Sequence, residues 1–203
     1  RKNVRMMAGR PLVLYSVENA LSLKESYDLD LAVSTDDEEL KNIVMNHGAE
    51  VVDRDETLSA DGVTLDPVIY DAVKKMEAAH SCTYDYVITM QATSPTLRPV
   101  TLKNAFKFFI NGRYDTLISC VNKPHLSWTE IDGRIVKNYD KRLNSQELPK
   151  NLLETGAFMM SRRSVVTEES RIGENVFVYE TSAAEAVDID TEEDWIEAES
   201  IMK

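Results

Sequence analysis

The chain has 203 residues, 43% of them hydrophobic and 29% charged, which is enough apolar material for one domain spanning residues 1–203. Its formal net charge of -12 argues against nucleic acid or an anionic membrane as a partner, because both require a basic surface. No apolar run reaches the length of a membrane helix and no secretory segment is visible, so we expect a cytoplasmic protein.

The first part of the chain predicts a strand, a helix and a second strand. Residues 29–34 read as a short buried strand, apolar positions recur at helical spacing over residues 40–47, and residues 50–52 read as a strand. Either Thr35 or Asp36 is expected to cap the helix, because each is followed three residues later by Glu.

The same alternation continues toward the carboxyl end. Helices are expected near residues 66–79 and 100–111 and from residue 192, and strands at residues 86–90, 116–121, 156–160 and 176–179. This order indicates an α/β fold with a doubly wound, mostly parallel sheet of Rossmann-like type. Ligands of such sheets bind beyond the carboxyl ends of the strands. Polar residues follow the predicted strands at residues 34–36, 91–94 and 122–123.

The alternation breaks down within residues 122–151. Residues 131–135 there predict a hairpin, and a polar stretch follows. The segment is too short for an independent domain. We interpret it as an excursion from the sheet that serves as a lid or a dimerisation arm.

Two aspartates near the carboxyl end form the strongest local pattern. In the segment 187–191, Val-Asp-Ile-Asp-Thr, an extended backbone directs Asp188 and Asp190 to the same side. Two carboxylates so placed supply half of a Mg2+ site, whose remaining ligands are commonly water and substrate phosphates. The alternative is that Asp190 or Thr191 only caps the last helix, with Asp194 completing a capping box. The two roles can coexist.

Residues 89–98 run from a strand into small polar residues. Gln91, Thr93 and Ser94 offer neutral donors and acceptors suited to a polyhydroxy ligand. The alternative is a hydrogen-bonded turn, for which Ser-Pro is a common opening.

Basic residues contribute two weaker candidates. Arg54, in the loop 53–64, could clasp a nucleotide base or could form an ordinary surface ion pair. Four basic residues precede the first acid, Glu18, and make either a phosphate-binding patch or a solvated terminus: Arg1, Lys2, Arg5 and Arg10. The two cysteines and three histidines show no metal-ligand spacing.

Four motifs in register make the chain similar to the acylneuraminate cytidylyltransferases, the CMP-sialic acid synthetases, over nearly its whole length. Residues 1–3 with 8–12 resemble the passage after the family's glycine-rich loop, and residues 33–39 resemble its Val-Ser-Thr-Asp-Asp-Glu-Glu stretch. Residues 91–95 match the Gln-Pro/Ala-Thr-Ser-Pro signature. Residues 187–191 match the Val-Asp-Ile-Asp metal motif.

The resemblance implies a function: transfer of CMP from CTP to the anomeric hydroxyl of N-acylneuraminate or a related nonulosonic acid, with release of pyrophosphate. It implies that Asp188 and Asp190 hold Mg2+ and are catalytic together with Lys2. It further implies a homodimer, with residues 146–149 in the dimerisation region. The nucleotide would be held by Lys2, Asn3, Arg54, Val63 and Thr64, and the sugar acid by Gln91, Thr93 and Ser94.

The sequence also departs from the family pattern. The family's phosphate loop and the strand before it are absent, the arginine expected before Gln146 is Ser145, and Thr155 replaces the asparagine expected before Gly156. Two alternatives therefore stay open. One is another sugar nucleotidyltransferase, such as one that activates an octulosonic acid, and the other is a catalytically inactive binding module of the same fold.

Overall fold

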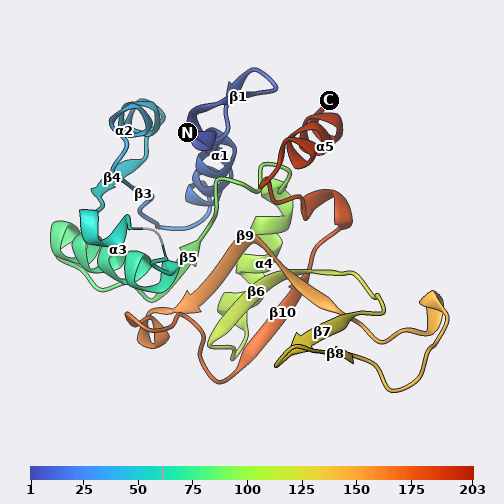
Figure 1. The fold of residues 1–203 in the computed structure, drawn as a ribbon. Helices are drawn as coiled ribbons and strands as arrows, with labels where there is room; N and C mark the ends of the chain where they lie inside the picture. The colour runs from blue at the N-terminus through green and yellow to red at the C-terminus, as the bar shows by residue number, and fades with distance from the viewer. Residues whose placement is uncertain (61) are drawn as a thin grey trace.

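A four-stranded mixed sheet with the order β10-β6-β9-β5 forms the centre of the computed structural model, which describes residues 1–60 and 62–203 (Figure 1). β6 (Thr116–Asn122) is parallel to β10 (Val176–Glu180). β9 (Leu152–Arg162) lies antiparallel between β6 and β5 (Tyr86–Thr89). The predicted α/β class is confirmed, and β9 is an antiparallel member that the sequence pattern did not reveal.

A second, parallel pair consists of β3 (Ala32–Thr35) and β4 (Glu50–Asp53), joined by α2 (Glu38–Met45). The predicted cap of α2 is wrong. Asp37 is the N-cap residue, because its carboxylate accepts the backbone N–H groups of Glu39 and Leu40 at 2.9 and 3.1 Å. The Thr35 hydroxyl instead accepts the N–H of Asp37 at 3.1 Å and shapes the turn that leads into the helix.

The four further helices are α1 (Val13–Lys24), α3 (Leu65–His80), α4 (Pro99–Asn111) and α5 (Glu192–Met202). α4 buries an apolar stripe against β6 and β9, and this stripe includes Leu102, Phe106 and Phe109. α5 begins with the predicted capping box, in which Thr191 accepts the N–H of Asp194 at 3.2 Å. None of the helices in the described ranges is long and apolar enough to cross a bilayer.

Short elements complete the chain. β1 (Met6–Met7) and β2 (Arg10–Pro11) pair ahead of α1. The hairpin predicted within residues 122–151 is formed by β7 (Trp128–Ile131) and β8 (Arg134–Lys137), and its residues are all exposed. It stands apart from the helices in Figure 1. Single 3-10 turns occur at Lys2–Val4, Glu56–Leu58, Ser145–Glu147, Arg163–Val165 and Ala183–Glu185.

A register shift between β6 and β9 shapes the centre of the sheet. The shift falls between Ile118 and Cys120 of β6, and two buried hydroxyl groups occupy it. Ser119 Oγ and Thr155 Oγ1 lie 2.8 Å apart, and Ser119 Oγ also accepts the N–H of Phe158 at 3.1 Å. These bonds satisfy polar groups that the irregular ladder would leave unpaired.

A buried carboxylate fastens the start of α4 to the segment that leads toward Asp188. Glu185, 3% exposed, accepts the backbone N–H of Arg98 at 3.2 Å and its guanidinium at 2.9 Å. Burial alone would raise the pKa of the Glu185 carboxyl, but hydrogen bonds from Arg98, Thr101 and Ser182 outweigh burial and lower this pKa to about 2.

We therefore predict that Glu185→Gln lowers the free energy of unfolding at neutral pH by about 1–3 kcal/mol. Since the folded pKa lies below the ordinary value of 4.5, the carboxylate stabilises the fold above that pH and loses its effect as pH falls toward about 2. Urea denaturation at several pH values should show the difference from the native chain shrinking over this interval. The matched control is Glu180→Gln, whose exposed pair with Lys150 should contribute little. A pH-independent difference for Glu185→Gln would contradict the assignment.

Candidate active site

The segment Val187–Asp190 alternates between core and surface. Val187 and Ile189 are buried, and they pack in the cluster that contains Met7, Leu12 and Trp195. The backbone N–H of Ile189 donates to the Thr93 carbonyl at 2.9 Å and ties this segment to the turn after β5. Because alternate side chains of an extended chain face opposite sides, burial of Ile189 directs Asp188 and Asp190 away from this core.

The side chains of Asp188 and Gln91 both approach Gly156. A Cβ atom added to Gly156 would be 2.7 Å from Gln91 Oε1 and 3.5 Å from Asp188 Oδ2, so both side chains approach the bare backbone of that residue. Gly156 has φ +68°, a conformation that glycine adopts with little strain. Asp188 Oδ1 is buried and has no hydrogen-bond partner among the described residues. A buried carboxylate oxygen in this state is costly until a donor or a cation meets it.

Asp190 is more exposed and lies beside Lys2. Lys2 Nζ is 3.3 Å from Asp190 Oδ1 and also contacts the Ile189 carbonyl oxygen. The backbone N–H of Asp190 donates to Asp194 Oδ2 at 3.0 Å, while Thr191 caps α5. The cap therefore leaves both aspartate side chains out of the helix, as the sequence analysis allowed.

The turn after β5 divides its polar residues between the site and the core. Gln91 and Thr93 are half-buried, with Thr93 Oγ1 3.5 Å from Gln91 Oε1. Ser16 of α1 donates its hydroxyl to the Gln91 carbonyl at 2.9 Å. Ser94 is 2% exposed and donates to the Thr155 carbonyl at 3.2 Å, so its hydroxyl supports the strand beside Gly156 rather than facing a ligand.

The remaining predicted residues come from the β3 and β4 side. Arg54 donates to the Ser34 carbonyl at 2.7 Å, which places its guanidinium at the carboxyl end of β3. Asn3 lies on the 3-10 turn that also carries Lys2. Val63 and Thr64 are exposed at the start of α3, where Thr64 is the N-cap residue without a side-chain cap bond.

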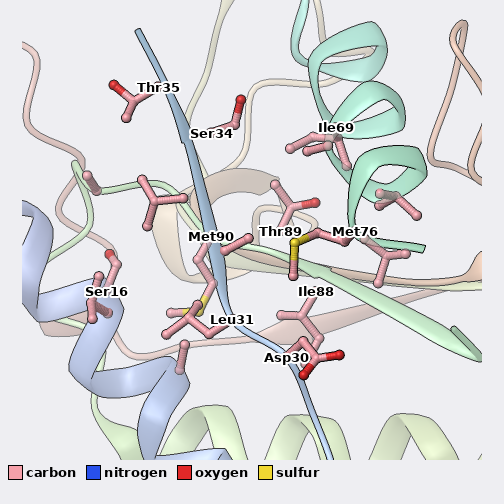
Figure 2. Close-up of a pocket in the computed structure, with 18 of the residues that line it drawn as sticks. Ser16, Asp30, Leu31, Ser34, Thr35, Ile69, Met76, Ile88, Thr89 and Met90 are labelled. Carbon is pink, nitrogen blue, oxygen red and sulfur yellow. The ribbon is translucent and has the colours of Figure 1, made fainter. Parts of the chain in front are cut away.

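A cavity of about 1180 Å³ lies between β3 and β5, bounded by α1 and α3. In Figure 2, Ser34 and Thr35 lie at one end of β3 and Asp30 at the other. The lining at the carboxyl end of the strands is polar and includes Lys2, Asn3, Ser34, Arg54, Gln91 and Thr93. The rest of the lining comes from apolar side chains of α1, α3, β3 and β5 and, at the far end, from polar residues that include Asp30, His80 and Tyr84. Asp188 and Asp190 are not part of this lining, but their neighbours Gln91 and Lys2 are.

Two arginines of the basic patch noted in the sequence, Arg1 and Arg5, lie near the site and are paired with acidic side chains. Arg5 stacks over the Trp195 ring at 4.0 Å and pairs with Glu192, and it thereby holds the N-terminal segment against α5. Arg1 pairs with Glu39 at 2.5 Å and with Asp37 at 3.3 Å. The basic patch at the start of the sequence was the available signal, yet only the fold could supply the acidic partners.

Comparisons with known proteins show what the chain is similar to. The family model described as Cytidylyltransferase matches residues 1–166. A pseudaminic acid cytidylyltransferase of Campylobacter jejuni is 30% identical over 206 residues, which cover 96% of this chain and 86% of that protein. An N-acylneuraminate cytidylyltransferase A of Danio rerio is 28% identical over 205 residues, which cover 98% of this chain and 46% of that longer protein.

A solved structure shows the same fold. It is that of CMP:2-keto-3-deoxy-manno-octonic acid synthetase complexed with CTP, with a TM-score of 0.65 and 16% identity. The likeness covers 99% of this chain and 91% of that one. This likeness supports the arrangement of strands and helices.

We predict that Gly156→Ala destabilises the chain more than Gly133→Ala does. Both glycines have positive φ, +68° and +72°, so each substitution carries a backbone penalty of about 1–2 kcal/mol. Only at Gly156 does the new Cβ meet another group, Gln91 Oε1, whereas the space at Gly133 is open. Urea denaturation of both variants measures the difference. Equal losses would show that Gln91 does not depend on the absence of a side chain at residue 156.

Proposed function

Because this chain belongs to the cytidylyltransferase family, we propose that it transfers CMP from CTP to the anomeric hydroxyl of N-acylneuraminate or a related nonulosonic acid and releases pyrophosphate. The observation that carries the proposal is the buried Asp188 Oδ1, which has no hydrogen-bond partner in the described part of the chain. Its side chain approaches Gly156 together with Gln91, and Lys2 lies at Asp190. The names of the relatives, which act on pseudaminic acid or N-acylneuraminate, support the sugar class.

Asp188 and Asp190 are the proposed Mg2+ ligands. Their carboxylates are the hard oxygen donors that this ion prefers, and the unpartnered Asp188 oxygen is the kind of atom that a cation would satisfy. When bound, Mg2+ would offset the negative charge of the triphosphate. Lys2 now pairs with Asp190, and its exposed ammonium is placed to contact phosphate oxygens.

The polar end of the cavity is the proposed nucleotide site. Lys2, Asn3 and Arg54 line it and come from two separate parts of the chain. Val63 and Thr64, at the start of α3, are proposed to complete the nucleotide contacts. In a chain of net charge -12, the cations gathered here give a triphosphate a local attraction that the rest of the surface lacks.

Gln91 and Thr93 are proposed to bind the sugar acid. Ser94 is proposed to support them through its hydrogen bond to the Thr155 carbonyl. The anomeric hydroxyl attacks the α-phosphorus of CTP, a new P–O bond forms, the bond to pyrophosphate breaks, and the hydroxyl proton is released. This chain's contribution is to orient the two reactants and to offset charge with Lys2 and Arg54. We assign the reaction to the cytoplasm, where nucleoside triphosphates are available.

The test is a thermal shift with CTP and Mg2+ on Asp188→Asn. A ligand that binds only the folded chain raises its melting temperature, and we expect this rise to be lost in the variant. Without ligand the variant should be no less stable than the native chain, because the substitution removes the charge of a carboxylate whose buried Oδ1 has no hydrogen-bond partner within residues 1–60 and 62–203. Glu193→Gln, an exposed change on α5, is the matched control and should respond like the native chain. An unchanged CTP response in Asp188→Asn would remove that residue from the site.

We propose that the chain forms a homodimer through the excursion at residues 122–151. The hairpin exposes large apolar side chains on both of its faces, including Trp128, Ile131, Ile135 and Val136. An isolated two-stranded hairpin is only marginally stable in water. Burial of its exposed apolar side chains against a second protomer would stabilise it. Leu152 and Leu153, which directly follow this segment in the chain, are also exposed.

We predict that Ile135→Lys shifts the chain from dimer to monomer in analytical ultracentrifugation. Ile135 is 64% exposed, so the change should scarcely alter the stability of the folded protomer. The control is Ile196→Lys on α5, where the isoleucine is 67% exposed and lies outside the proposed interface. The proposed interface would be contradicted if the native chain sediments as a monomer. It would also be contradicted if the Ile135→Lys variant still sediments as a dimer.

A further inference from the structure

The segment that follows β9, residues 163–171, is attached to α3 at two points, and we call it the strap. Arg163 Nε lies 2.7 Å from Glu77 Oε1 in the second half of the helix. Arg171 Nε lies 2.6 Å from Asp66 Oδ1 in its first turn. In Figure 1 the strap is the orange segment next to α3. Two arginines at the two ends of the strap therefore hold the two halves of one helix.

The backbone of Arg171 is anchored to the central sheet. Its carbonyl oxygen accepts hydrogen bonds from the hydroxyl groups of Thr116 at 3.1 Å and Ser161 at 2.6 Å. Thr116 is the first residue of β6 and Ser161 lies in β9, and both residues are buried. Thr116 Oγ1 also accepts the N–H of Gly173 at 3.0 Å. Arg171 is therefore fixed against two strands of the central sheet.

The first turn of α3 depends on this pair. Thr64, the N-cap residue, makes no side-chain cap bond, and Leu65 is 39% exposed. Within residues 1–60 and 62–203, the ion pair of this turn is the one between Asp66 and Arg171. The Arg171 side chain is 11% exposed and that of Asp66 is 27% exposed, so solvent screens their attraction less than it screens a surface pair.

The turn that Arg171 holds adjoins the proposed nucleotide site. Leu65 and Val68 of this turn line the cavity, and Asp66 lies between them in the chain. Val63 and Thr64, the proposed nucleotide contacts, directly precede the turn and move with it because the backbone is continuous. A misplacement of about 1 Å at a binding site has a large effect on how a ligand is held. The pair with Arg171 is therefore in a position to affect the nucleotide from outside its site.

We propose that Arg171 is a positioning residue for CTP, an inference that rests on the function proposed above. Arg171 is not among the described residues that line the cavity, and it acts through Asp66. Its guanidinium joins the start of α3 to the central sheet, and this connection keeps Val63 and Thr64 where the nucleotide meets them. The position of one wall of the nucleotide site is thus set by a residue that follows β9.

The test is the dissociation constant for CTP in the presence of Mg2+, measured by titration calorimetry on the full chain below the melting transition of every variant. Arg171→Gln removes the charge of the guanidinium, and we expect it to weaken CTP binding about three- to thirtyfold. Arg171→Lys keeps a positive charge near Asp66 and should retain most of the affinity.

Arg163→Gln is the matched control, because it breaks a similarly buried arginine–carboxylate pair on the same helix. Both glutamine variants should melt at a lower temperature than the native chain. Only Arg171→Gln should weaken CTP binding, because Glu77 lies toward the end of α3 that is remote from Val63 and Thr64. Equal effects of the two variants on CTP binding would show that Arg171 serves general stability only and would overturn the proposal.

Asp66→Asn tests the route through which Arg171 acts. It should weaken CTP binding as Arg171→Gln does, and the double variant should be no weaker than either single one, because both changes break the same pair. Native affinity in Arg171→Gln, together with loss of CTP binding in Asp188→Asn, would overturn this inference and leave the proposed function standing. A native chain that does not bind CTP would overturn both.

Discussion

Burial of Ile189 is the constraint on which the candidate active site depends. The residue is 1% exposed, and its backbone N–H is held by the Thr93 carbonyl. Ile189 is thereby fixed in the core between α5 and the N-terminal segment. Because neighbouring side chains of an extended backbone point to opposite sides, Asp188 and Asp190 face outward. The acidic pair is therefore a consequence of hydrophobic packing, and the chemistry proposed for it rests on an apolar side chain that touches no substrate.

The central sheet supplies the second half of the site through an irregularity. β9 runs antiparallel to both of its neighbours, and its register shift against β6 is occupied by the buried hydroxyl groups of Ser119 and Thr155. Next to Thr155, Gly156 adopts a positive φ and leaves room for Gln91 and Asp188. The Ser94 hydroxyl donates a hydrogen bond to the Thr155 carbonyl. A regular ladder with a side chain at residue 156 would separate these groups.

The local distribution of charge in this protein differs from what its net charge suggests. The chain is strongly acidic, yet its first residues are basic, and each has an acidic partner from a distant element. Arg1 pairs near α2, Lys2 at Asp190, and Arg5 at Glu192. These exposed pairs contribute little to stability. The pairs of Arg1 and Lys2 hold these two cations at the edge of the cavity.

The sequence by itself determined the alternation of strands and helices, the capping box at Thr191, the hairpin after β6 and the four motifs that identify the family, because each is encoded in residues close together along the chain. It did not determine the direction of β9, since this strand is buried on both faces and its continuous apolar run reads like that of a parallel strand. It also misplaced the cap of α2, where three neighbouring polar residues compete and backbone geometry selects Asp37. Only the tertiary structure decided that Lys2 meets Asp190, that Gly156 separates Gln91 from Asp188, and that Arg171 pairs with Asp66. Those contacts link residues far apart in sequence, and local patterns carry no information about such distances.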